Sequence, residues 1–183
     1  MQNKFQDLKQ RFHVVQLAQF NAKVLEGLQR NAKNSPSGPF QVLIDLCASQ
    51  TISAFPPAPS TLNQSVHFSM AYLTLVWLWE SLTEDQVKAI VSNSRVSKLL
   101  SDFQLEGPRA PGTCEVKLKL MRNALSHGKV KINDGFVFEF WDQRVSGKTP
   151  EVDSTHLLLK SEALGEFLTE FYFATSDIVY PNK

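Results

Sequence analysis

The hydrophobic pattern of this chain has a helical period over most of its length and changes to a period of two after Gly128. Upstream of Gly128, apolar residues recur at three- and four-residue steps, which is typical of amphipathic helices. Downstream, apolar and polar residues alternate in Val130-Lys131-Ile132 and again in Phe138-Glu139-Phe140, which is typical of β-strands. The chain is therefore predicted to be mostly α, an antiparallel helical bundle with a small sheet inserted before its last helix.

The predicted elements follow from this pattern and from its breaks at proline, glycine and capping residues. In the first helix, an apolar stripe runs from Val14 through Leu17, Phe20 and Val24 to Leu28. The predicted helices are 4–33, 40–55, 60–82, 83–100 with a break near 92–94, 113–128, and one that Ser161 caps. A hairpin with an Asn-Asp-Gly turn is predicted at 130–141, and a short strand at 155–159.

Length and composition predict one globular domain over residues 1–183, since 43% of the residues are hydrophobic and 20% are charged. Cys47 and Cys114 lie far apart in the sequence, which excludes a disulfide scaffold and a cysteine-based zinc knuckle. His13, His67 and His156 show no metal-ligand spacing, so we expect neither a metal nor a cofactor. The longest apolar run, residues 70–79, is about half a membrane span. Without a signal-peptide pattern, we expect a cytoplasmic protein that does not enter membranes.

The net charge of +1 excludes a polybasic protein, but the charge is unevenly distributed. Residues 1–33 and 109–148 each carry a net charge of +4, whereas 34–108 carry −3 and 149–183 carry −4. Two basic segments in a neutral chain are consistent with a local anion-binding face. They are also consistent with ordinary variation of charge along solvated helices.

The predicted helix at 113–128 carries the residues best suited to chemistry. On a helical wheel at about 100° per residue, its apolar residues fill one broad arc. Its polar residues fall together in the remaining sector: Lys119, Arg122, Asn123, Ser126 and His127.

Arginine, asparagine and histidine at one helix end suit phosphodiester chemistry. Histidine exchanges a proton near physiological pH, and the arginine fork matches a pair of phosphate oxygens. RNA supplies its own nucleophile, the 2′-hydroxyl group, so an acid, a base and a phosphate clamp suffice. One helix offers one histidine, and two copies facing each other would offer two. The alternative is structural, because arginine and histidine also cap helix ends and pair with carboxylates.

The sequence Arg122-Asn-Ala-Leu-Ser-His127, followed by Gly128 and placed late in a helical chain, resembles the HEPN superfamily. The signature of that superfamily is an arginine, a neighbouring polar residue, and a histidine four to six residues later. Arg122, Asn123 and His127 match it. More narrowly, the chain looks like the HEPN group named after the plasmid protein pEK499 p136. In that comparison the 130–141 hairpin is an insertion between the motif helix and the last helix.

The resemblance implies a metal-independent endoribonuclease, a homodimer with two motifs meeting in an interface cleft, and a toxin or phage-defence role. Arg122 and His127 would be catalytic and Asn123 supporting. Lys119, Ser126, Lys129 and Lys131 are expected to contact RNA, the alternative for the last two being solvated hairpin lysines. Some HEPN toxins carry a tyrosine two residues after the histidine, which a partner enzyme modifies. Lys129 stands there, so that modification is not expected, although an antitoxin protein remains a possible partner.

Two alternatives stay open beside this interpretation. A HEPN scaffold can bind RNA, a nucleotide or a partner protein without turnover, because a fold does not fix a function. The second alternative is a purely structural dimer within a larger defence complex. Glu80, at the end of an apolar helix, is interpreted as a structural partner of Arg122 rather than a catalytic acid. The aromatic residues are interpreted mainly as core or interface, with base stacking as the alternative: Trp77, Trp79, Phe138, Phe140 and Trp141.

Overall fold

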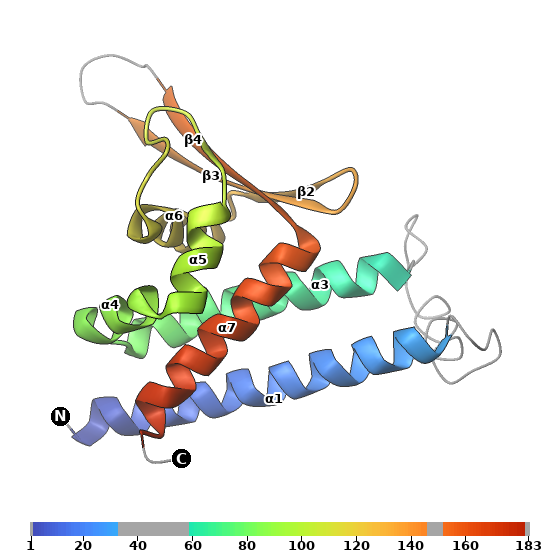
Figure 1. The fold of residues 1–183 in the computed structure, drawn as a ribbon, viewed down its shortest axis with the longest axis vertical. Coiled ribbons are helices and arrows are strands. Elements are labelled where there is room, and N and C mark those ends of the chain that lie inside the picture. The colour runs from blue at the N-terminus through green and yellow to red at the C-terminus, as the bar shows by residue number, and fades with distance from the viewer. Residues whose placement is uncertain (1, 33–58, 146–151, 182–183) are drawn as a thin grey trace.

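The structure, a computed structural model, describes residues 2–32, 59–145 and 152–181, which form a helical body with a small antiparallel sheet before the last helix (Figure 1). The helices are α1 (Gln2–Ala32), α3 (Pro59–Tyr72), α4 (Glu84–Ser92), α5 (Ser94–Asp102), α6 (Cys114–Ser126) and α7 (Ser161–Val179). A π-helical turn, η1 (Leu73–Leu78), and a 3₁₀ turn, η2 (Trp79–Ser81), continue α3. The strands are β1 (Leu105–Glu106), β2 (Val130–Asn133), β3 (Val137–Val145) and β4 (Val152–Lys160). The predicted mostly α fold is confirmed.

The predicted break within residues 83–100 is confirmed and has a capping residue at its centre. Asn93 separates α4 from α5, and its side-chain oxygen accepts hydrogen bonds from the backbone N–H groups of Arg95 and Val96. Upstream, Thr83 and Gln86 form a reciprocal capping box at the start of α4. The predicted helix at 40–55 lies outside the described residues.

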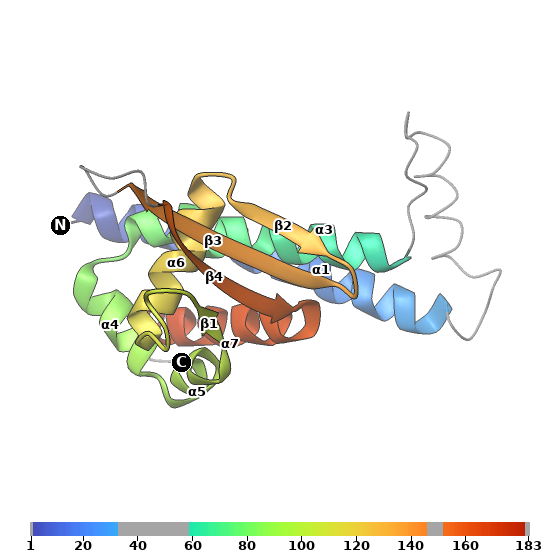
Figure 2. The ribbon, with the colours of Figure 1, turned by 90° about the horizontal axis from the view of Figure 1, so that it is seen from above.

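Helix α6 lies between the sheet and the α3–η1 segment, and both contact it (Figure 2). Thr113 caps its N-terminus by accepting a hydrogen bond from the N–H of Val116. Past its C-terminus, Gly128 adopts a φ of 65°, a left-handed conformation that favours glycine and turns the chain into β2. The predicted apolar arc is confirmed by the residues buried on this helix: Leu118, Leu120, Met121, Ala124 and Leu125.

The sheet has the strand order β1-β4-β3-β2, with every neighbouring pair antiparallel. The predicted hairpin and the strand at 155–159 are confirmed, whereas β1 was not predicted because two residues carry no readable period. The turn uses positive φ angles at Gly135 (73°) and Phe136 (63°). Four apolar side chains of β3 and β4 are buried on the face toward the helices: Phe138, Phe140, Leu157 and Leu159.

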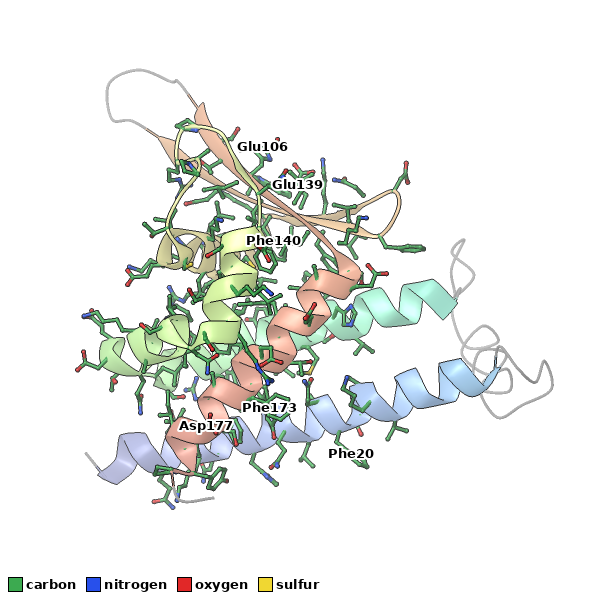
Figure 3. All side chains as sticks on the ribbon, viewed as in Figure 1. Phe20, Glu106, Glu139, Phe140, Phe173 and Asp177 are labelled. Carbon is green, nitrogen blue, oxygen red and sulfur yellow. The ribbon has the colours of Figure 1, made fainter. Side chains whose placement is uncertain are left out.

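The stripe predicted on the first helix proved not to be its buried face. Leu17 and Phe20 are 52% and 66% exposed, and Phe20 projects from α1 away from the rest of the molecule (Figure 3). The buried residues lie on the opposite side of the helix, roughly 175° around it: Leu8, Phe12, Val15 and Ala22. Both faces carry apolar residues at helical spacing, and contact with α7, where Phe12 stacks on Tyr172 at 5.0 Å, decides between them.

The last helix confirms its predicted apolar face but not its predicted cap. Lys160 occupies the N-cap position of α7 and makes no side-chain capping bond. Ser161 is the first helical residue, and its hydroxyl lies 2.8 Å from Nδ1 of His67, which joins α7 to α3. The residues predicted to face the core are buried: Leu164, Phe167, Leu168 and Phe171. In the described ranges, none of the helices has the length and apolar character needed to span a membrane.

Lys117 ties α6 to the C-terminal end of α5. Its side chain is 5% exposed, and Nζ donates to the carbonyls of Leu100 and Ser101 at 2.9 and 3.0 Å. We expect Lys117→Met to lower the free energy of unfolding by about 1–3 kcal/mol, because two carbonyls lose their charged donor. Urea denaturation would measure this loss, and Lys98→Met, an exposed change on α5, should stay within about 0.5 kcal/mol of the wild type. Equal effects of the two substitutions would contradict the assignment.

Candidate functional site

The polar sector predicted on α6 is confirmed as the part of this helix that faces away from the core. Lys119, Ser126 and His127 are exposed, whereas Arg122 and Asn123 are half-buried. Residues of η2 and α4 line a pocket together with Arg122 and Asn123, whereas Ser126 and His127 do not line it. The sector therefore has a recessed part and an open part.

Arg122 lies against Trp79 of η2, with its guanidinium carbon 5.9 Å from the centre of the indole ring. Its Nε is buried, yet it has no hydrogen-bond partner. No carboxylate in ranges 59–145 and 152–181 forms an ion pair with it. A buried N–H donor without a partner costs free energy, so its presence marks Arg122 as a candidate ligand-binding residue.

A pocket of about 430 Å³ opens beside Arg122, between η2, α4 and α6. This volume falls within the range of roughly 300–1,000 Å³ that is usual for small-molecule sites. The walls are apolar, and the residues that form them are Trp79, Leu82, Val87, Val91 and Leu118.

Charged and polar side chains line the same pocket, and we refer to this set as its rim. Three basic side chains and one amide reach it, and they are Lys88, Lys119, Arg122 and Asn123. Two carboxylates, Glu84 of α4 and Glu115 of α6, also line it. Such a pocket offers apolar surface for a flat ring, donors for an anion and acceptors for N–H groups.

His127 lies outside this pocket, at the C-cap of α6. Its backbone N–H donates to the carbonyl of Asn123 at 3.0 Å, which places it one turn beyond that residue. The residue is exposed, and its imidazole makes no hydrogen bond with another described residue. The ring is therefore open to solvent and to a second molecule.

Ser126 and Lys129, predicted to contact RNA, have structural bonds in the monomer. The hydroxyl of Ser126 donates to the carbonyl of Arg122 at 2.9 Å. The N–H of Lys129 donates to the carbonyl of Ala124, and its carbonyl accepts from the N–H of Trp141, which fastens the end of α6 to β3. Neither residue lines the pocket, whereas Lys119 does.

Lys131, also predicted to contact RNA, belongs to a polar network on the sheet face opposite the helices. Its Nζ lies 3.0 Å from Glu139, which also accepts from Asn133 at 2.8 Å and contacts Nδ1 of His156 at 2.8 Å. His156 Nε2 in turn lies 3.0 Å from the hydroxyl of Ser154. Hydrogen bonds, first that from Asn133, lower the pKa of Glu139 from 4.5 to about 2. Figure 3 shows Glu139 on the sheet, above the buried Phe140.

Glu80 does not pair with Arg122, contrary to the interpretation of the sequence. Its carboxylate lies 3.2 Å from the guanidinium of Arg11 on α1, and Arg11 also donates to the carbonyl of Trp77. Trp79 and Glu80 are consecutive in the tight turn η2, so their side chains diverge, one toward α6 and the other toward α1. Its interpretation as a structural rather than catalytic carboxylate is consistent with this pair.

No sequence pattern indicated the pocket residues that α4 contributes. Glu84 fits the N-terminus of a helix, and Lys88 fits its solvated face, so neither suggests a ligand site. Of the aromatic residues considered for stacking, Trp79 lines the pocket, whereas Phe138 and Phe140 are core residues. Among the described residues, no three His, Cys, Asp or Glu side chains are grouped as metal ligands.

A family model described as HEPN pEK499 p136 matches residues 3–180, nearly the whole chain. No curated protein and no solved structure matches. The match covers both the helical segments and the sheet that precedes α7.

The lowered pKa of Glu139 predicts a pH dependence of stability. A carboxylate whose pKa falls from 4.5 to about 2 on folding stabilises the fold fully above pH 4.5, and this contribution is lost as the pH falls through 2. We expect Glu139→Gln to be less stable than the wild type at pH 6, with the difference shrinking toward pH 2. Urea denaturation at several pH values would measure it, with Asp85→Asn as the control at an exposed carboxylate. A difference that does not change with pH would contradict the lowered pKa.

Proposed function

The chain belongs to the HEPN pEK499 p136 family, and from this premise we propose that it is a metal-independent endoribonuclease acting through Arg122, Asn123 and His127. The observation that carries the proposal is the state of these side chains. They lie on one sector at the end of α6, and neither the guanidinium Nε nor the imidazole has a hydrogen-bond partner among the described residues. Polar groups left unpaired in this way are suited to a ligand.

Arg122 is assigned to the scissile phosphate. Its guanidinium is permanently charged and can donate two parallel hydrogen bonds to phosphate oxygens, which stabilises the charge that develops on them in the transition state. The contact with the indole of Trp79 restricts the orientation of the guanidinium. Asn123 is assigned a supporting hydrogen bond to the phosphate or to the imidazole.

His127 is assigned to proton transfer. As a base it accepts the proton of the 2′-hydroxyl group, whose oxygen attacks the adjacent phosphorus. The bond from phosphorus to the 5′-oxygen breaks, and that oxygen takes a proton from an acid. The products are a 2′,3′-cyclic phosphate and a free 5′-hydroxyl group, so no metal is required.

A homodimer supplies the acid and the base together. The monomer places one histidine at the motif, and His127 is exposed at the end of α6, where a second copy can approach it. In this arrangement one His127 acts as the base and its counterpart as the acid. We place such a nuclease among cytoplasmic toxin or phage-defence effectors, with an antitoxin protein as a possible partner.

One observation favours the alternative, a scaffold that binds RNA, a nucleotide or a partner protein without turnover. Arg122 and Asn123 line the pocket, whereas His127 does not. A ligand bound entirely within the pocket would contact Arg122 and Asn123, which are assigned to the phosphate, but not His127, which is assigned to proton transfer. Cleavage assays separate the two functions.

We expect purified protein to cleave RNA in the presence of EDTA, leaving 2′,3′-cyclic phosphate ends. Arg122→Ala and His127→Ala should each lower the rate at least about 100-fold, the usual range for removing an acid–base group or a transition-state donor. Gel analysis of labelled RNA would measure the rate, with Lys98→Ala as the control and circular dichroism to verify folding. Cleavage at the wild-type rate by either active-site variant would contradict the proposal.

The dimer predicts a nonlinear loss of activity in mixed populations. When wild-type and His127→Ala chains are unfolded together and refolded, random pairing makes the share of dimers with two histidines the square of the wild-type fraction. We therefore expect activity at equal mixing to fall to about one quarter per total dimer. A fall to one half would show that a single His127 suffices, and chains that stay monomeric at active concentrations would exclude the shared site.

A further inference from the structure

The pocket beside Arg122 combines apolar walls with two carboxylates, and we propose that it binds an unpaired guanine base of the RNA substrate. The inference rests on the proposed ribonuclease function, because it takes Arg122 as the ligand of a phosphate next to that base. It adds a sequence preference that the catalytic residues alone do not provide.

The walls of the pocket suit the faces of a nucleobase. The volume of about 430 Å³ has room for one base with part of its sugar. Trp79 provides an aromatic ring, and Leu82 and Val87, which are partly exposed, provide aliphatic surface around it. Unpaired bases stack on such surfaces, and stacking accepts any base because every base has an aromatic face. The walls therefore explain binding of an unpaired nucleotide, and the choice of base must come from the rim.

The rim favours a base with adjacent N–H donors. Glu84 and Glu115 come from two different helices and line the same pocket, and neither carboxylate pairs with another described residue. A carboxylate accepts hydrogen bonds on both oxygens and donates none. On its pairing edge, guanine presents the neighbouring donors N1–H and N2–H₂, which one carboxylate can accept together. Adenine, cytosine and uracil each place an acceptor beside their donor on that edge, and a carboxylate repels it.

The position of the catalytic motif relative to the pocket determines which phosphodiester bond of the RNA is cleaved. Arg122 and Asn123 line the pocket, and His127 lies one helical turn beyond Asn123, outside it. A guanosine with its base in the pocket therefore has its phosphate near Arg122 and its ribose side toward His127. The cleaved bond is thus adjacent to this guanosine.

Binding of nucleotides tests the pocket without depending on cleavage. Titration calorimetry on the wild-type protein would compare 3′-GMP with 3′-AMP, 3′-CMP and 3′-UMP. We expect 3′-GMP to bind at least about tenfold more tightly, the discrimination that one bidentate base contact provides. In the double variant Glu84→Gln and Glu115→Gln, this preference should fall below about threefold, while Glu166→Gln, an exposed change on α7, should retain it.

A second arm distinguishes RNA from a free nucleotide. The hexanucleotides UUGUUU and UUAUUU would be titrated into the His127→Ala variant, which keeps every pocket residue and should not cleave them. Tighter binding of the guanosine-containing RNA is expected. Selective binding of 3′-GMP without any preference between the hexanucleotides would assign the pocket to a free nucleotide and overturn the inference.

The outcomes also separate this inference from the proposed function. Cleavage sites mapped on an RNA of random sequence should lie next to guanosine in the wild type. Cleavage without base preference, together with equal affinity for the four mononucleotides, would leave the ribonuclease standing and reject the guanine pocket. Selective binding of guanosine without cleavage of any RNA would keep the pocket assignment and reject the nuclease.

Discussion

The burial of one face of α6 between the sheet and the α3–η1 segment is the constraint on which the rest of the structure depends. Leu120, Met121 and Ala124 are fully enclosed there, so the helix cannot rotate without exposing them. Its remaining sector is therefore held outward, with Arg122 and Asn123 directed toward η2 and α4. The left-handed turn at Gly128 then returns the chain as the sheet that covers the buried face.

The contact between Trp79 and Arg122 connects this constraint to function. The π-helical turn η1 and the tight turn η2 bring Trp79 beside α6, and π-helical turns recur at functional sites. The guanidinium gains an aromatic partner but leaves its Nε unpaired in a buried position. A sequence selected for stability alone would pair this donor with an acceptor. An unpaired buried donor is therefore the kind of local inconsistency expected at a binding site.

Much of the fold could be read from the sequence, because it depends on local periodicity and capping. The break at Asn93, the apolar arc of α6 and the hairpin after Gly128 follow from such patterns and are confirmed. The buried face of α1 could not be chosen, since two faces of that helix carry apolar residues and only packing against α7 decides between them. Strand β1 and the pairing of Glu80 with Arg11 also depend on partners distant in sequence.

The sequence by itself determined the residues of the motif and their common position on one sector of α6, because helical geometry fixes the relation between positions one turn apart. Only the tertiary structure decided what surrounds that sector. Trp79 and Glu84 line the same pocket as Arg122, although they lie more than thirty positions away from it in the chain. The same packing leaves His127 exposed to solvent. Spacing along a helix carries no information about such neighbours, since they are brought together by burial of the core on the opposite face.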